Sequence, residues 1–451
     1  MRAAMPLPPE RSPSPPEPRG LAPGAPLKGV FRPQGSKSLA QRGLLAALLS
    51  PGVTRLRGLP EADDVRRAVE LCRAAGAELR APEAGLLELR GGGLRPRGTL
   101  DAGESGTLAR LATAAAALHA PPGRQVRIGA SGTLLERSSP ALWRALEGAG
   151  AVLRGAGRPG GWPLVVERPA GPVDEVLLER PGSSQEASGL LLALAARPDP
   201  GRLRVRGAIP SRPYLEMTRG VLAVFGVSTP LQREGDDEVF QIAGSLTPPA
   251  GGFAVEPDAS SAAVALAAAC ISGGELRVSG LGSDSPQGDV RILEHLAAFG
   301  CRCAGGRDHL TAGGAPVRGA VLDLSHEPDL APVLAAVAAA AALTAGAESR
   351  LTGLATLRGK ESDRVAALAE ALRAAGVAVR EEPAALAIGP ADTAAAPGPR
   401  AIDSRGDHRI AFAGALLGLA RPGLRVSEPG CVAKSWPRFW EDLESLGATA
   451  A

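Results

Sequence analysis

The stretch Pro33-Gln-Gly-Ser-Lys-Ser-Leu-Ala-Gln-Arg42 leads into a long apolar run, and the rest of the chain is organised around it. Its glycine is followed by two serines that can cap a helix, and the apolar run begins at Leu44. At a helix entry the free N–H groups and the positive end of the helix dipole face outward. Lys37 and Arg42 add full positive charges there, so the stretch predicts an anion-binding helix entry.

Lysine is scarce in this chain. Among 50 basic residues only four are lysine, namely Lys28, Lys37, Lys360 and Lys434. Three of the four lie in dense polar clusters, at 35–42, 360–364 and 431–435. A compact ammonium with a tunable pKa cannot be replaced by a planar guanidinium at a site of chemistry. These three lysines are therefore candidates for a chemical role.

Composition excludes several classes of function. With 451 residues and 45% hydrophobic content, the chain is long enough for two or three domains with large cores. The net charge of +3, with scattered arginines and 3% aromatic residues, gives no basis for nucleic-acid binding. The five cysteines have no metal-ligand spacing and no disulfide pattern, which predicts a reduced, cytoplasmic protein.

Two segments need a separate interpretation. Residues 1–26 carry nine prolines and no apolar core of the signal-peptide kind, so they predict a disordered tail. The longest apolar stretch, 330–345, is mostly alanine and contains Pro332. It is short for a membrane span and is better interpreted as a buried helix.

A strand and helix pattern repeats along the chain at intervals of about 75 residues. Six amphipathic helices are predicted to end at Gly76, Gly150, Gly226, Gly300, Gly376 and Gly447. Six further helices, apolar on nearly every face, follow polar clusters at 35–38, 104–107, 182–185, 258–261, 327–329 and 407–409. Helices of this kind are buried, so duplicated α/β units with helices inside and sheets outside are predicted. Their polar N-termini can converge on one anionic ligand.

The chain resembles the 5-enolpyruvylshikimate-3-phosphate synthases, members of the enolpyruvyl transferase family. The motifs that carry the resemblance occur in order at 35–42, 182–185, 211–214, 258–261, 360–364, 407–409 and 433–434, and the likeness runs from about residue 28 to 447. It implies a two-lobed inside-out α/β barrel of six βαβαββ repeats, three per lobe. The first lobe would comprise 36–257, the second 27–35 plus 258–451, with the active site in the cleft between them.

The resemblance also implies an activity. The enzyme would be a transferase that moves the enolpyruvyl group of phosphoenolpyruvate to the 5-hydroxyl of shikimate 3-phosphate and releases phosphate, in the pathway to chorismate and the aromatic amino acids. It would need no metal and no other cofactor. Its partners would be these two small molecules, without nucleic acid or membrane, and it would act as a cytoplasmic monomer.

By resemblance, serines 183, 184 and 211 hold the shikimate phosphate, while Ser38 and Arg42 hold the carboxylate. The full set implied for shikimate 3-phosphate is Lys37, Ser38, Arg42, Ser183, Ser184, Gln185, Ser211, Tyr214, Asp329, Thr356 and Lys360. The set implied for phosphoenolpyruvate is Lys37, Gly106, Arg137, Gln185, Arg364, Arg409 and Lys434. Simple helix capping by the serines, a structural Tyr214 and surface charge for the arginines remain alternatives.

Three residues are implied for proton transfer. Asp329 would accept the proton of the 5-hydroxyl, and Glu361 would donate one to the methylene carbon, with Lys37 near enough to share either task. A helix cap for Asp329 and an ion pair with Lys360 or Arg364 for Glu361 remain alternatives.

The chain departs from the family pattern at three positions. Glu104 stands where asparagine is usual, Thr356 replaces an asparagine that contacts the shikimate phosphate in many members, and Ser138 stands where proline is common. We expect altered affinity rather than lost activity. Gly106 matches a glycine beside which the herbicide glyphosate binds in members that carry it, so inhibition competitive with phosphoenolpyruvate is expected.

Three other functions were weighed against this one. A phosphate-binding loop of the kinase type fails because Ser36 separates Gly35 from Lys37 and Val30 stands where its first glycine belongs. A UDP-N-acetylglucosamine enolpyruvyl transferase would share the fold, but no cysteine lies in the matching loop near Arg137. A non-catalytic α/β repeat scaffold leaves the clustered lysines and acids unexplained.

Overall fold

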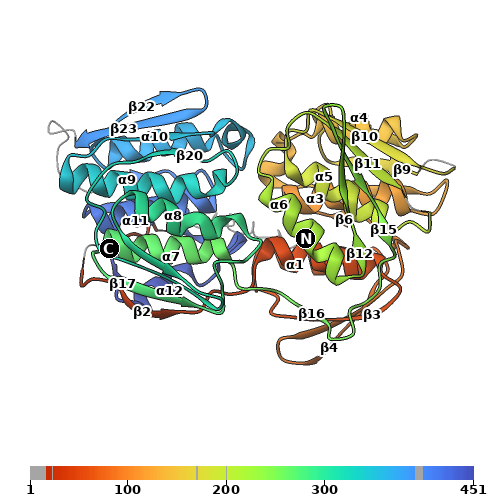
Figure 1. The fold of residues 1–451 in the computed structure, drawn as a ribbon, viewed down its shortest axis with the longest axis horizontal. Helices are drawn as coiled ribbons and strands as arrows, with labels where there is room; N and C mark the ends of the chain where they lie inside the picture. The colour runs from red at the N-terminus through yellow and green to blue at the C-terminus, as the bar shows by residue number, and fades with distance from the viewer. Residues whose placement is uncertain (1–16, 23, 169–170, 200, 392–399) are drawn as a thin grey trace, which may run out of the picture.

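The chain forms two lobes side by side, and Figure 1 shows them joined through the start of α1 and the segment before α7. The computed structural model describes residues 17–22, 24–168, 171–199, 201–391 and 400–451. One hydrophobic core draws on residues 39–255, and the other on 21–31 together with 259–448. The two-lobed α/β fold that the sequence predicted is confirmed.

In the described residues, the first lobe has six helices and three four-stranded sheets, and α1, α3 and α5 are the helices buried nearly throughout. The helices are α1 (Lys37–Leu49), α2 (Asp63–Ala74), α3 (Gly106–His119), α4 (Pro140–Gly148), α5 (Ser184–Ala195) and α6 (Pro213–Val224). In spatial order, the sheets are β16 (Phe253–Ala254), β3 (Gly52–Arg57), β5 (Leu86–Gly91), β4 (Glu78–Glu83); β6 (Leu100–Asp101), β7 (Gln125–Gly129), β9 (Leu164–Glu167), β8 (Val152–Gly155); and β10 (Glu175–Glu179), β11 (Arg202–Arg206), β14 (Asp237–Gln241), β13 (Leu231–Glu234). A small pair, β12 (Val227–Ser228) and β15 (Ala243–Gly244), completes the lobe.

The second lobe repeats this plan. Its helices are α7 (Ala259–Ile271), α8 (Ile292–Ala298), α9 (Ala331–Ala345), α10 (Arg364–Ala374), α11 (His408–Ala420) and α12 (Phe439–Ser445). Its sheets are β2 (Lys28–Phe31), β17 (Glu275–Ser279), β19 (His309–Gly313), β18 (Arg302–Gly305); β20 (Val321–Asp323), β21 (Ser349–Thr352), β23 (Ala385–Ala391), β22 (Val377–Glu382); and the pairs β24 (Arg400–Ile402) with β25 (Leu424–Val426) and β1 (Leu21–Ala22) with β26 (Thr449–Ala450).

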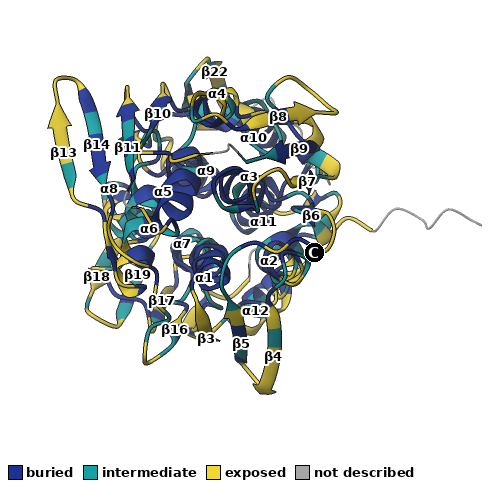
Figure 2. Ribbon diagram, turned by 90° about the vertical axis from the view of Figure 1, so that its right-hand side faces the viewer, coloured by how far each residue is buried: buried dark blue, intermediate teal, exposed yellow. Residues whose placement is uncertain are grey.

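Each four-stranded sheet has the same topology. Two parallel strands come first, and an antiparallel hairpin pairs with the second of them, as in β10, β11, β14 and β13. In three of these sheets the parallel strands are joined by one buried helix, α3 between β6 and β7, α5 between β10 and β11, and α9 between β20 and β21. A helix serves here because a parallel connection must cross from one end of the sheet to the other. Figure 2 shows α3, α5, α9 and α11 in the colour of buried residues, with partly exposed strands around them.

Two strands are exchanged where the chain passes between lobes. β2 pairs in parallel with β17, and β16 pairs in parallel with β3, so each lobe receives one strand from a distant part of the sequence. At the crossing, Gly35 and Pro257 form an antiparallel bridge. A side chain at position 35 would clash with the carbonyl oxygen of Gly58, so the close passage requires glycine.

The structure of the N-terminal segment contradicts part of the disordered tail predicted for residues 1–26. Residues 17–22 and 24–26 are part of the fold and not of a disordered tail, because Leu21 is fully buried and β1 pairs with β26. A bridge from Arg19 to Val426 joins the segment to β25 as well. It thus takes the place that the last strand of the hairpin has in the other sheets. Proline content misled the prediction, since proline is tolerated at strand ends and edges. Residues 1–16 and 23 lie outside the described part.

The apolar helix predicted at 330–345 lies in the core of the second lobe. Within the described residues, Pro328–Ala345 is the one segment long and apolar enough to cross a membrane, and 78% of it is buried inside the fold. Its length and composition are therefore those of a core helix. It packs against α11 and α7, and its N-terminal end carries Asp329 to the junction of the lobes.

Candidate active site

The buried helices point their N-termini at one cavity. A cavity of about 440 Å³ lies between the lobes and is lined from both. Ser105 caps α3, Ser183 caps α5 and Asp407 caps α11, each by accepting a hydrogen bond from a backbone N–H of the first turn. Several positive dipole ends and uncapped N–H groups therefore face the same space, as the sequence predicted, and favour anionic ligands.

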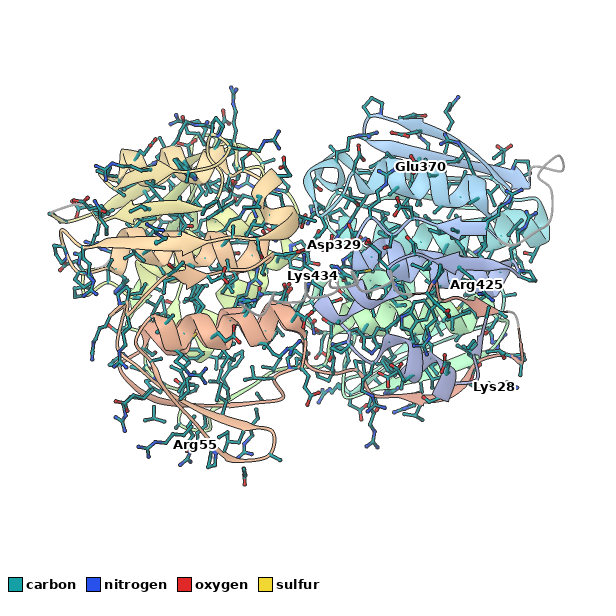
Figure 3. The ribbon with its side chains drawn as sticks, turned by 180° about the vertical axis from the view of Figure 1, so that it is seen from behind. Lys28, Arg55, Asp329, Glu370, Arg425 and Lys434 are labelled. Atoms are coloured by element: carbon teal, nitrogen blue, oxygen red, sulfur yellow. The ribbon has the colours of Figure 1, made fainter. Side chains whose placement is uncertain are left out.

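The structure brings nearly all the predicted site residues together. Those that line the cavity are Lys37, Ser38, Arg42, Gly106, Arg137, Ser183, Ser184, Gln185, Ser211, Tyr214, Asp329, Thr356, Lys360, Glu361, Arg364 and Arg409. Lys434 instead lines a neighbouring cavity of about 540 Å³, with its ammonium 3.4 Å from the Glu361 carboxylate. Figure 3 shows Lys434 and Asp329 at the junction of the lobes, far from the exposed Lys28.

Asp329 is the most heavily contacted acid of the site. Its Oδ1 lies 3.0 Å from Arg364 and 3.5 Å from Lys360, and its Oδ2 lies 3.3 Å from Arg409. Burial alone would raise the pKa of this carboxyl, but Arg409, Lys360 and Arg364 outweigh burial and hold the pKa far below its usual range. The carboxylate is therefore ionised in the unliganded protein.

Glu361 lies in a second cluster of charged side chains. It pairs with Arg364 at 2.7 Å on its own lobe and with Arg137 of the other lobe at 3.7 Å. Burial raises the pKa of Glu361, but Arg364, Arg137 and Lys434 together hold it well below its usual range. An ion pair of Glu361 with Arg364, one of the alternatives weighed from the sequence, is thus present.

Arg364 is fully buried and satisfied by three carboxylates. Nε and Nη2 donate to the two oxygens of Asp407, at 2.8 and 3.1 Å, in a fork that fixes the plane of the guanidinium. The remaining donors reach Asp329 and Glu361. Asp407 thus both caps α11 and orients an arginine that faces the cavity.

Arg409 connects the site to a buried acid behind it. Its guanidinium donates to the backbone oxygen of Asp329 at 2.8 Å and to the hydroxyl of Ser260 at 3.1 Å. That hydroxyl in turn donates to Asp289, whose other carboxylate oxygen is buried without a hydrogen-bond partner in the described residues. Burial raises the pKa of Asp289 to about 6, although Arg409 opposes the rise.

On the first lobe, Lys37 and Arg42 are both held by neighbours. Lys37 pairs with Asp64 at 3.0 Å. Arg42 is 1% exposed and donates to Thr218 at 2.8 Å and to the backbone oxygens of Ser38 and Tyr214. Burial lowers the pKa of Arg42 to about 10, which leaves it charged at neutral pH.

The start of α3 at Gly106 lies beside two arginines, Arg110 and Arg137. Arg110 donates to the backbone oxygen of Gly106 at 2.9 Å and to Gln185 at 3.1 Å. Arg137 donates to Thr133 at 2.6 Å. A Cβ at Gly106 would lie 2.9 Å from Nη1 of Arg110 and 3.0 Å from Nη1 of Arg137. The glycine therefore lets both guanidiniums approach the cavity.

The polar serines and Thr356 differ in how far their own fold satisfies them. Ser183 caps its helix in a full capping box, which is the alternative weighed from the sequence. Ser211 has a φ of 53°, a left-handed conformation uncommon for serine, and lies close to Ser325 of the other lobe. Thr356 Oγ1 is buried and has no hydrogen-bond partner in the described part of the chain.

Sequence reasoning missed three residues that the structure recruits, namely Asp64, Arg110 and Asp289. Arg110 lies one helical turn after Gly106, so the spacing i, i+4 was a readable signal. Asp64 and Asp289 lie in short acidic stretches far from the motifs, and nothing local sets them apart. Across the described ranges, no group of three His, Cys, Asp or Glu side chains is placed to hold a metal ion.

Comparison with solved structures defines the class of protein. The fold matches EPSP synthase from Acinetobacter baumannii with a TM-score of 0.73 and 26% identity, over 96% of this chain and 99% of that one. It also matches the enolpyruvyl transferase NikO from Streptomyces tendae, TM-score 0.71 and 19% identity, over 96% and 98%, which is a likeness of fold. The fold is therefore the one that EPSP synthase and this enolpyruvyl transferase share.

The chain belongs to the EPSP synthase (3-phosphoshikimate 1-carboxyvinyltransferase) family, whose model matches residues 21–443. The 3-phosphoshikimate 1-carboxyvinyltransferase of Laribacter hongkongensis is 37% identical over 436 residues, 95% of this chain and 99% of that protein. The one from Methanoculleus marisnigri is 35% identical over 427 residues, 94% and 97%. The chain is a transferase of the shikimate pathway, and its family uses shikimate 3-phosphate and phosphoenolpyruvate.

Proposed function

We propose that this chain binds shikimate 3-phosphate and phosphoenolpyruvate together in the interlobe cavity and joins the enolpyruvyl group to the 5-hydroxyl. The observation that carries the proposal is Asp329, a carboxylate in contact with three cations of its own lobe and with Tyr214 of the other. A cavity of about 440 Å³ lies within the usual range for small-molecule sites. Its excess of cations suits two polyanions.

Shikimate 3-phosphate is assigned to the first-lobe side. Ser183, Ser184 and Ser211 hold its phosphate near the N-terminus of α5, where the dipole favours a dianion. Ser38 and Arg42 hold its carboxylate. Its remaining contacts are assigned to Lys37, Gln185, Tyr214, Asp329, Thr356 and Lys360, and the free Oγ1 of Thr356 supports its place among them.

Phosphoenolpyruvate is assigned to the part of the cavity where the two lobes meet. Arg364 and Arg409 grip its carboxylate, because forked guanidiniums fix the plane of such a group with parallel charge-assisted bonds. Its phosphate is assigned to Lys37, Arg137, Gln185 and Lys434, with Gly106 against the same pocket. Arg110 orients Gln185 and the Gly106 backbone and is a positioning residue.

Proton transfer is assigned to Asp329 and Glu361, with Lys37 near both. Asp329 takes the proton of the 5-hydroxyl while the hydroxyl oxygen attacks C2 of phosphoenolpyruvate. Glu361 gives a proton to C3. This first step forms a tetrahedral phospho-ketal. In the second step the C–O bond to phosphate breaks, and the phosphate leaves with its electron pair and takes up the proton that Asp329 holds. A proton returns from the methyl carbon to Glu361 as the double bond forms again.

The substrates themselves adjust both carboxyl groups. In the unliganded protein the pKa of Asp329 and that of Glu361 are held low by the cations around them. The carboxylate and phosphate of the bound substrates neutralise those cations, so the pKa of each carboxyl rises toward the range in which proton transfer is efficient. Catalytic competence is thereby linked to occupation of both subsites.

We also propose that 36–257 and 27–35 with 258–451 act as the two halves of the enzyme, and that the protein works as a cytoplasmic monomer without nucleic-acid or membrane partners. The two hydrophobic cores, which draw on these segments, support this division.

Phosphate release tests the proposed function. Purified protein should release phosphate only when both substrates are present, in an amount equal to the enolpyruvyl product measured by mass spectrometry. Replacing shikimate 3-phosphate by UDP-N-acetylglucosamine should give no product. Turnover with the UDP-sugar, or phosphate release from phosphoenolpyruvate alone, would overturn the assignment of the acceptor.

A further inference from the structure

Two ion pairs join the lobes beside the cavity. Lys434 of the second lobe lies 3.6 Å from the carboxylate of Glu104 on the first, and its ammonium also donates to the Glu104 backbone oxygen at 3.4 Å. Arg137 of the first lobe lies 3.7 Å from Glu361 of the second. Both pairs use a cation that is assigned above to the phosphate of phosphoenolpyruvate.

The Glu104 carboxylate has a prepared position. A side chain at Gly132 would clash with Oε1 of Glu104, so this glycine leaves the space that the carboxylate fills. Thr133 donates a hydrogen bond to the other oxygen at 3.4 Å. Glu104 is nevertheless 43% exposed, whereas the Lys434 side chain is 9% exposed, so the lysine is the more constrained partner.

Lys434 lies between Glu104 and the cavity that holds the other candidate residues. Both residues line the second cavity, of about 540 Å³, which lies beyond the one that holds the other candidate residues. Lys434 contacts the first cavity through Glu361, at 3.4 Å. A phosphate in the first cavity must therefore compete with Glu104 for this ammonium.

We propose that Glu104 is a specificity-determining residue that competes with the phosphate of phosphoenolpyruvate for Lys434 and thereby weakens retention of phosphate in the site. The inference rests on the proposed function, in which Lys434 serves that phosphate. Its consequence is selective: binding of phosphoenolpyruvate and of the product phosphate is weakened, while shikimate 3-phosphate, held on the opposite side of the cavity, is unaffected.

Glu104→Gln tests this inference, because it removes the charge and keeps the size of the side chain. We expect the KM for phosphoenolpyruvate and the inhibition constant of inorganic phosphate each to fall about two- to fivefold, the range of a partly exposed ion pair. The KM for shikimate 3-phosphate should stay the same. Unchanged or raised constants for phosphate and phosphoenolpyruvate would overturn the inference.

Two further variants show whether the effect of Glu104→Gln on phosphate binding is specific to its contact with Lys434. Glu83→Gln removes an exposed glutamate that pairs with Arg57 on the surface of the same lobe, and it should change none of these constants. In a Lys434→Gln background, Glu104→Gln should no longer tighten phosphate binding, since the effect passes through the lysine. If Glu104→Gln tightens phosphate binding as much in the Lys434→Gln variant as in wild type, Glu104 does not act through Lys434.

A direct measurement of phosphate binding tests the inference without relying on turnover. Inorganic phosphate titrated calorimetrically into the unliganded protein should bind about two- to fivefold more tightly to Glu104→Gln than to wild type. If the wild-type protein does not release phosphate from the two substrates, the proposed function is wrong. The titration still shows whether Glu104 weakens phosphate binding. Glu104→Asn makes the same charge change with a shorter side chain and serves if the glutamine variant does not fold.

Discussion

The phenol of Tyr214 donates a hydrogen bond to Oδ2 of Asp329 at 3.2 Å, which joins the first lobe to the acid that the second lobe presents to the cavity. Burial, together with Asp289 and Asp329, raises the pKa of Tyr214 well above its usual range. The phenol therefore keeps its proton throughout the working pH range and acts as a donor. This contact also places the sole tyrosine of the chain against the candidate general base.

Tyr214→Phe removes only this hydrogen bond and the donor it presents to the cavity. A hydrogen bond to a charged group is worth about 1.5 to 3 kcal/mol, but Asp329 keeps three cationic partners, so the lower end applies. We expect kcat/KM to fall about tenfold in steady-state assays of phosphate release. A loss of a thousandfold or more would mean that the phenol acts on the reacting atoms.

Asp329→Asn should separate binding from turnover. The cavity becomes more positive, so calorimetric affinity for shikimate 3-phosphate should hold, whereas kcat should fall about 100- to 10,000-fold, the usual contribution of a positioned general base. Asp363→Asn is the control, because Asp363 caps α10 outside the cavity. Equal losses of affinity and rate for Asp329→Asn would assign it a structural role.

Lys37→Arg keeps the charge and changes its shape and pKa. The ammonium lies 3.0 Å from Asp64 in a half-buried position, where a larger planar group cannot keep the same contact. We expect kcat/KM to fall at least about 100-fold, or roughly 2.7 kcal/mol. Lys28→Arg on the exposed face of β2 should leave it unchanged. Wild-type kinetics for Lys37→Arg would remove its chemical role.

Gly106→Ala probes the space beside Arg110 and Arg137 at the start of α3. The new methyl meets Nη1 of both arginines, so the two guanidiniums must shift. We expect glyphosate inhibition competitive with phosphoenolpyruvate in wild type, and a penalty of about 1 to 3 kcal/mol for the longer inhibitor in the variant, larger than for the substrate.

The control for this substitution is Gly220→Ala, whose methyl meets nothing within 4 Å. It should change neither the glyphosate inhibition constant nor the KM for phosphoenolpyruvate. A wild type that is insensitive to millimolar glyphosate would contradict the assignment of Gly106, unless Glu104→Gln restores inhibition.

Asp289 predicts a pH dependence of stability. Its pKa is about 6 in the folded chain and 3.8 ordinarily, so below about pH 3 the carboxyl is protonated in both states. As pH rises from about 4 to 6, the unfolded chain is ionised while the folded chain still holds the proton, and up to about 3 kcal/mol of folding stability is lost over this window. Asp289→Asn should abolish this loss, as measured by denaturant unfolding between about pH 3 and pH 8.

The exposed Asp236→Asn is the control for that series and should retain the wild-type pH dependence. If Asp289→Asn and wild type lose stability in parallel as pH rises, Asp289 is not the titrating group.

Much of the fold could be predicted from the sequence because the interactions that determine it act between residues close together in the chain. Glycines after the amphipathic helices, polar clusters before the buried ones and the arginine-rich strands all follow from backbone conformation and burial within one unit. Several motif residues, among them Lys37, Ser183 and Arg409, lie at the entry of a helix, but the resemblance to the family assigned the site residues their roles. The N-terminal strand could not be, because a strand of two residues has too little pattern of its own.

The sequence by itself determined the repeated α/β units, the buried helices and the residues that stand at their entries, since helix propensity, capping and hydrophobic period act over a few residues. The tertiary structure alone decided that Tyr214 meets Asp329, that Glu104 meets Lys434, and that Asp64, Arg110 and Asp289 serve the site. These contacts join segments tens to hundreds of residues apart. Their geometry depends on how the two lobes pack, and no local pattern records that.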